Sequence, residues 1–85
     1  MKVDELKYAD SVRDFMTSRL GFDPEEYDFD YEGIDAVSGW EIVRARHADD
    51  RKESGELVPG TGSGKSRTLY LDPSSGEVKQ ALEWP

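Results

Sequence analysis

The chain has 85 residues, with 11 Lys plus Arg, 19 Asp plus Glu and one His, so its formal net charge is −8. This length allows one small domain with a modest core and excludes a multi-domain enzyme. The acidic balance argues against direct binding of nucleic acid or anionic membranes, and the lack of Cys excludes disulfides, thiolate nucleophiles and zinc–thiolate clusters.

The first part of the chain has the apolar spacing of a helix. Apolar residues recur at three- and four-residue steps, at Val3, Leu6, Ala9, Val12, Met16 and Leu20. This spacing predicts an amphipathic helix over 3–20, with Gly21 as its left-handed cap. The next residues, Asp23-Pro24-Glu25-Glu26, have capping chemistry and predict a single helical turn.

Two strands are predicted next. Aromatic and acidic residues alternate strictly in Tyr27-Asp28-Phe29-Asp30-Tyr31-Glu32, which predicts a strand with three rings on one face and three carboxylates on the other. A second strand is predicted over 40–46, where Trp40, Ile42 and Arg44 share a face. We expect Phe29 and Trp40 in the core; Tyr31 and Trp84 fit either a core or an interface position.

The second half of the chain predicts a loop and a hairpin. Residues 48–66 lack periodicity and are rich in Gly, Ser and charged residues, so we expect a flexible or functional loop there. Strands are predicted over 66–71 and 77–84, joined by turn residues 72–76. The expected fold is α+β and occupies residues 1–85 as one domain. An N-terminal helix packs on a four-stranded antiparallel sheet.

Two motifs resemble ligand-binding loops but lack a required part. The stretch Gly60-Thr61-Gly62-Ser63-Gly64-Lys65-Ser66 resembles a nucleotide-binding P-loop, yet Pro59 stands where the pattern needs its first Gly, and the following residues indicate a strand instead of a helix. The stretch from Asp28 to Gly33 copies the opening of a calcium-binding EF-hand loop, but Gly39 stands where the bidentate Glu belongs. We therefore expect no cofactor and no metal.

The sequence offers no catalytic constellation. His47 is the only histidine, and we expect it to be exposed at a strand end beside Asp49 and Asp50. No nucleophile, base and orienting group can be assembled from the available residue types. We expect the protein not to be an enzyme.

The acidic residues are concentrated in the first half of the chain. Residues 1–35 carry 11 acids and four bases, whereas residues 36–85 carry eight acids and seven bases. One interpretation is a solvated face that serves solubility; another is a recognition surface for a basic cleft. The candidate partner-binding residues are Asp23, Glu25, Glu26, Asp28, Asp30, Tyr31, Glu32 and Asp35.

The order of elements resembles that of PepSY domains and of some small toxin-immunity proteins. The resemblance rests on a helix, a strand reading Trp40-Glu41-Ile42-Val43 and a hairpin reading Asp72-Pro73-Ser74-Ser75-Gly76-Glu77-Val78. It implies a helix on a curved antiparallel sheet, cystatin-like in appearance, with a binding or inhibitory role and no catalysis. The family residues that the resemblance identifies in this sequence are Trp40, Asp72 and Gly76, and it implies a structural role for them.

The sequence therefore predicts a small acidic, non-catalytic protein that inhibits or masks a partner with a basic surface, as immunity proteins and DNA-mimic inhibitors such as anti-CRISPR proteins do. The alternative is a scaffold domain of a larger assembly, or a domain from a salt-rich organism, whose acidity serves only solubility. We expect a monomer or a weak homodimer through a sheet edge. No apolar run reaches membrane-spanning length and no signal-peptide pattern is present, so we expect a cytoplasmic location.

Overall fold

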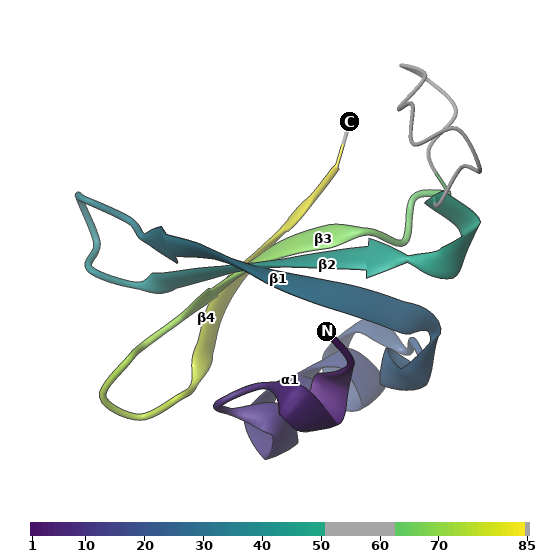
Figure 1. The fold of residues 1–85 in the computed structure, drawn as a ribbon, viewed down its shortest axis with the longest axis horizontal. Coiled ribbons are helices and arrows are strands. Elements are labelled where there is room, and N and C mark those ends of the chain that lie inside the picture. Colours follow the sequence, from purple (N-terminus) through teal and green to yellow (C-terminus); the bar gives the residue numbers. More distant parts are fainter. Residues whose placement is uncertain (51–62, 85) are drawn as a thin grey trace.

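The computed structural model describes residues 1–50 and 63–84. Within them, one antiparallel sheet has the strand order β1-β2-β3-β4, with bounds Tyr27–Ile34, Glu41–His47, Arg67–Leu71 and Val78–Glu83. Helix α1, Ala9–Phe15, lies on one side of this sheet (Figure 1). The predicted α+β fold, an N-terminal helix on a four-stranded antiparallel sheet, is confirmed. No helix among the described residues combines the length and apolar character needed to cross a bilayer.

The N-terminal segment is not one continuous helix, so the prediction of a helix over 3–20 was wrong in its first third. Val3–Glu5 forms a 3-10 turn (η1), and Leu6 is extended with a ψ of 148°. α1 begins only at Ala9 and runs directly into a π-helical turn, η2, over Met16–Leu20. The turn ends at Gly21 with a φ of 72°, the left-handed cap that the sequence predicts.

The break has a physical cause at the edge of the sheet. The amino group of Met1 donates to the Phe29 carbonyl at 2.8 Å, and the Phe29 N–H donates to the Met1 carbonyl at 2.7 Å. These two bonds hold the start of the chain against edge strand β1. A helix that continued from α1 towards the N-terminus would not place Met1 beside Phe29. Val3 and Leu6 are nevertheless buried, so the apolar spacing marks the buried side although the backbone is interrupted.

The core lies between the N-terminal segment and one face of the sheet. Tyr27 and Phe29 of β1 are fully buried, which confirms the core position of Phe29, whereas Tyr31 remains 37% exposed. The buried hydrophobic residues of this layer are Val3, Leu6, Val12, Met16, Tyr27, Phe29, Val43, Ala45, Leu69 and Leu71. Alternating positions of each strand thus face α1, as period-two geometry requires.

On β2 the buried positions are Val43, Ala45 and His47. Trp40, Ile42 and Arg44 therefore share a face, as predicted, but it is the face turned away from α1. The expectation that Trp40 belongs to the core was wrong, because its position has the opposite parity to the buried residues. Its ring lies partly exposed beside Tyr70, with ring centroids 6.5 Å apart.

The connections differ in how well the sequence predicts them. The turn at 72–76 forms as expected: Asp72 accepts hydrogen bonds from Ser74, and Gly76 has a φ of 77°. In the predicted loop over 48–66, Ala48–Asp50 forms a 3-10 turn, η4, and residues 63–66 lead into β3. Residues 51–62, which hold most of the predicted flexible loop, lie outside the described part of the chain.

Candidate functional site

Seven of the eight candidate residues are acidic and follow the chain from η3 (Pro24–Glu26) along edge strand β1 to the β1–β2 turn. We call them the acidic margin: Asp23, Glu25, Glu26, Asp28, Asp30, Glu32 and Asp35. The eighth candidate, Tyr31, lies within the same strand. The structure thus places the predicted residues along the edge of the sheet, because β1 is its first strand. It divides their side chains between two faces, however: Glu25 and Tyr31 contact the N-terminal segment, whereas Glu32 pairs with Arg44 on the opposite face.

The carboxylates around η3 have defined partners. Asp23 caps the turn by accepting a hydrogen bond from the Glu25 N–H at 3.0 Å. Glu25 forms an ion pair with Arg13 of α1 at 2.7 Å, and Glu26 lies 3.5 Å from Nε2 of His47. These contacts fasten η3 to α1 and to the end of β2.

On β1 the acidic row points away from α1, as the alternation predicts, but it is not an isolated ladder. Asp28 lies opposite Arg46 in the strand register, and Asp30 lies opposite Arg44. Arg44 forms an ion pair with Glu32 at 3.2 Å, and Lys2 with Asp28 at 3.4 Å. Opposite charges across neighbouring strands stabilise a sheet, so part of the row's charge is balanced within the protein.

Within residues 1–50 and 63–84, carboxylates outnumber the cations along the margin. Four cationic side chains in these ranges face its seven carboxylates through ion pairs or strand register: Lys2, Arg13, Arg44 and Arg46. Among the described residues negative charge is thus in excess there, and Asp30 is exposed. The sequence alone suggests a larger excess, because the arginines that oppose the row come from a different stretch of chain.

Tyr31 and Asp35 each have a structural contact. The Tyr31 hydroxyl accepts a hydrogen bond from the Lys7 N–H at 2.8 Å, which ties β1 to the N-terminal segment. Asp35 accepts hydrogen bonds from the Ser38 N–H and hydroxyl, each at 2.8 Å, within the β1–β2 turn. These bonds stabilise the ionised form and hold the pKa of Asp35 below its ordinary value.

Sequence reasoning missed a second group of residues on the same side of the sheet. We call the side turned away from α1 the outer face. Beside the acidic row and the two arginines it carries a patch of apolar and aromatic side chains, all of them partly or well exposed: Trp40, Ile42, Tyr70, Leu82 and Trp84. Alternation within the predicted strands is the sequence signal for this patch, because it sets Tyr70, Leu82 and Trp84 on the faces opposite to the core-facing positions of their strands.

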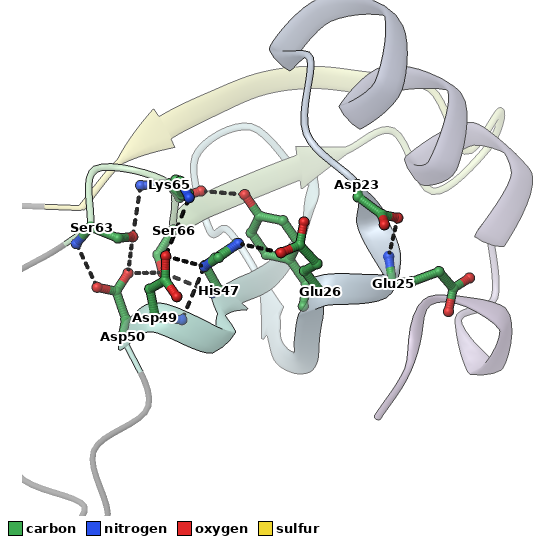
Figure 2. Close-up of polar contacts among 10 residues, drawn as sticks. Asp23, Glu25, Glu26, His47, Asp49, Asp50, Ser63, Lys65 and Ser66 are labelled. Atoms are coloured by element: carbon green, nitrogen blue, oxygen red, sulfur yellow. Dashed lines mark hydrogen bonds and ion pairs between the residues drawn. The ribbon is translucent and has the colours of Figure 1, made fainter.

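Figure 2 shows a polar cluster at the other end of β2, around His47. His47 is only 3% exposed, so the expectation of an exposed histidine was wrong. β2 continues to this residue, whose parity is that of buried Val43 and Ala45. The imidazole packs edge-on against Tyr27 with centroids 4.9 Å apart, and Nδ1 accepts a hydrogen bond from the Asp49 N–H at 3.0 Å.

Asp50 is the acceptor at the centre of this cluster. It receives the Ser63 N–H at 2.6 Å, the Ser63 hydroxyl at 2.9 Å and the Ser66 hydroxyl. Burial acts to raise the pKa of the Asp50 carboxyl, but the hydrogen bonds from Ser66 and Ser63 outweigh it, and the pKa lies below its ordinary value. Asp50 thereby fastens the chain entering β3 to the end of β2.

The P-loop-like and EF-hand-like residues have structural contacts in the described part of the chain. Lys65 lies 3.2 Å from Asp49, and β3 begins directly after Ser66, where a P-loop would start a helix. Asp28, Asp30 and Glu32 lie within strand β1 and not in a loop. Among residues 1–50 and 63–84, no group of three or more His, Asp or Glu side chains is arranged to hold a metal ion.

Comparisons with protein-family models, with curated proteins and with solved structures find no match to this chain. The arrangement of the described side chains therefore carries the functional argument alone. In the His47 cluster the Ser66 hydroxyl reaches Asp50, while the imidazole meets Glu26 and Asp49. These contacts hold the start of β3 against the end of β2.

Proposed function

We propose that this protein is a non-catalytic binding module that inhibits or masks a partner protein with a basic surface, which it contacts through the acidic margin. The observation that carries the proposal is the row of carboxylates along η3 and β1, which outnumber the cations that pair with or oppose them within residues 1–50 and 63–84. Excess charge of one sign on one side of a small protein speeds association with a complementary surface and orients the encounter.

Immunity towards a toxin and mimicry of DNA in the groove of a nucleic-acid enzyme are two forms of this proposal. Both would set carboxylates against a cationic surface. The PepSY-like order of elements also implies binding without catalysis. The pairing of Glu32 with Arg44 supports a second candidate, a scaffold domain whose acidity serves solubility.

Matched variants of equal net charge separate the two candidates. One variant carries Glu25→Gln, Asp30→Asn and Glu32→Gln on the acidic margin. The control carries Asp4→Asn, Asp10→Asn and Asp14→Asn, at exposed positions of the N-terminal segment. Each is immobilised, exposed to lysate of the source cells, and the captured proteins are identified by mass spectrometry.

We expect the control to retain a basic partner that the margin variant loses by at least about tenfold, since charged contacts across an interface are worth more than about 1.4 kcal/mol together. Equal capture by the two variants would show that net charge alone is responsible and would contradict the proposal. Absence of any specific partner for the unmodified chain would favour the scaffold candidate.

A further inference from the structure

We propose that the outer face of the sheet docks a protein segment that carries basic and apolar side chains together. The proposal rests on the proposed function and extends it, because it adds an apolar contact and thereby narrows the kind of partner. Its basis is a juxtaposition on one side of the sheet: the carboxylates of β1 lie beside the arginines of β2, and the same face carries the patch of Trp40, Ile42, Tyr70, Leu82 and Trp84.

The apolar side chains do not lie singly on the surface but form two groups on this face, with Thr68 and Arg44 between them. Ile42 lies opposite Tyr70 in the register of β2 and β3, and the Tyr70 ring contacts that of Trp40. Leu82 is 43% exposed. It lies opposite Thr68, which accepts a hydrogen bond from the Trp84 indole at 3.0 Å. Grouped apolar side chains with a polar rim mark contact surfaces, and Trp, Tyr and Arg dominate binding energy where they occur.

Charge favours a different protein over a second copy as the occupant. Two copies could stack through their outer faces with their strands aligned, related by a two-fold axis that lies between the two sheets. If this axis runs perpendicular to the strands, the acidic row of one copy lies against the acidic row of the other. An axis along the strands would set the row against β4, whose outer-face residues Gln80 and Leu82 bring no base. The net charge of −8 per chain adds repulsion in both arrangements. A segment with Lys or Arg near Asp30 and an apolar side chain near Leu82 matches both parts of the face.

The test uses three synthetic peptides of equal length with the full chain. One alternates lysine and leucine, one alternates lysine and serine, and one alternates glutamate and leucine. Both tryptophans of the chain, Trp40 and Trp84, belong to the outer face, so their fluorescence reports binding at this surface. Sedimentation of the unbound chain measures its oligomeric state.

We expect the lysine–leucine peptide to bind about tenfold more tightly than the lysine–serine peptide, because one buried apolar side chain contributes about that factor. Leu82→Ser and Tyr70→Ser should remove the difference and leave lysine–serine binding unchanged. The glutamate–leucine peptide should not bind. The control Val37→Ser, on the 97% exposed turn residue, should behave like the unmodified chain.

Equal binding of the two lysine peptides would overturn this inference and leave the acidic margin as the whole contact. Failure of both lysine peptides to bind would count against this inference and against the proposed function together. A dimer of the unbound chain that Leu82→Ser converts to a monomer would also overturn the inference, because a second copy would then be the occupant.

Discussion

The guanidinium carbon of Arg44 lies 4.6 Å from the ring centroid of Trp84. The same guanidinium group forms the 3.2 Å ion pair with Glu32 of β1. Arg44 thereby connects the first strand of the sheet, through β2, to the residue that follows the last strand. A cation held between a carboxylate and an aromatic ring keeps its side chain ordered, so the outer face presents a fixed pattern of charge and rings.

A double-mutant cycle measures this relationship. Arg44→Ala and Trp84→Leu should each lower the free energy of unfolding, and their coupling should be about 0.5–1 kcal/mol, the range for cation–π pairs at partly exposed sites. Urea unfolding of the four proteins gives the value. Arg46→Ala in place of Arg44→Ala serves as the control and should show no coupling to Trp84. A coupling near zero for Arg44 would show that the ring contact contributes nothing to stability.

Gly76 is expected to be far less tolerant of alanine than Gly21. Both have a positive φ, 77° and 72°, so an added Cβ costs about 1–2 kcal/mol at either position. At Gly76 the Cβ would also collide with the ring of Tyr8, whereas at Gly21 nothing lies within 4 Å. The difference between Gly76→Ala and Gly21→Ala in urea unfolding isolates the collision. Equal losses would mean that the Tyr8 ring moves aside without cost.

Most of the fold follows from local patterns in the sequence. Alternation over Tyr27 to Glu32 fixes which side of β1 is buried, and the turn residues Asp72 and Gly76 fix the β3–β4 hairpin. The interruption after Glu5 depends instead on hydrogen bonds between Met1 and Phe29, which are 28 residues apart. No local pattern carries that information, and the apolar spacing is the same with and without the interruption.

The sequence predicts the acidic part of the candidate site but not the arginines that oppose it, because their position also depends on contacts between distant parts of the chain. Clustering of acids in one segment is visible in the sequence, and the structure places them along one margin. That Arg44 and Arg46 oppose Asp30 and Asp28 depends on the register between β1 and β2. Register in turn depends on the turn and on the irregularity between Tyr31 and Gly33, which neither charge nor hydropathy indicates. Trp40 is on the outer face because its parity is opposite to that of the buried residues Val43 and Ala45 of β2.

Neutralising Asp50 should loosen the start of β3. Asp50→Asn removes an ionised acceptor of hydrogen bonds from Ser63 and Ser66, and we expect a loss of about 1–3 kcal/mol near neutral pH. Hydrogen-exchange protection at Ser66 and in β3 should fall most. The control is Asp10→Asn, at an exposed position of α1. Unchanged exchange in β3 would show that the network does not fasten this segment.

The pH dependence of Asp50→Asn has a definite sign. Because the pKa of Asp50 is lowered in the folded protein, its stabilising effect is present above the unfolded pKa of about 4 and is lost as the pH falls through the folded value. The unmodified chain should therefore lose stability in acid more steeply than Asp50→Asn. If the free energy of unfolding falls equally steeply with decreasing pH for the two proteins, the assignment of this effect to Asp50 is contradicted.

Tyr27 should control stability at the alkaline end. Burial raises the pKa of its phenol to about 12, and its hydroxyl donates to the Lys65 carbonyl at 2.7 Å. A folded pKa above the unfolded value of about 10 means that the stabilising effect is complete below about pH 10 and is lost as the pH rises towards the folded value. Tyr27→Phe should lose about 1 kcal/mol near neutral pH, because the Lys65 carbonyl loses its donor.

The dependence of stability on pH above neutral distinguishes the titration of the Tyr27 phenol from a role of Tyr27 in packing alone. Stability measured by urea unfolding from neutral pH up to about pH 12 should fall less for Tyr27→Phe than for the unmodified chain, so the two curves should converge. Tyr70→Phe, on the outer face, is the control and should follow the unmodified chain. The absorbance of tyrosinate should also lose its latest-titrating step in Tyr27→Phe alone. If that step persists, the buried phenol is not the group that titrates last, and the loss of alkaline stability has another origin.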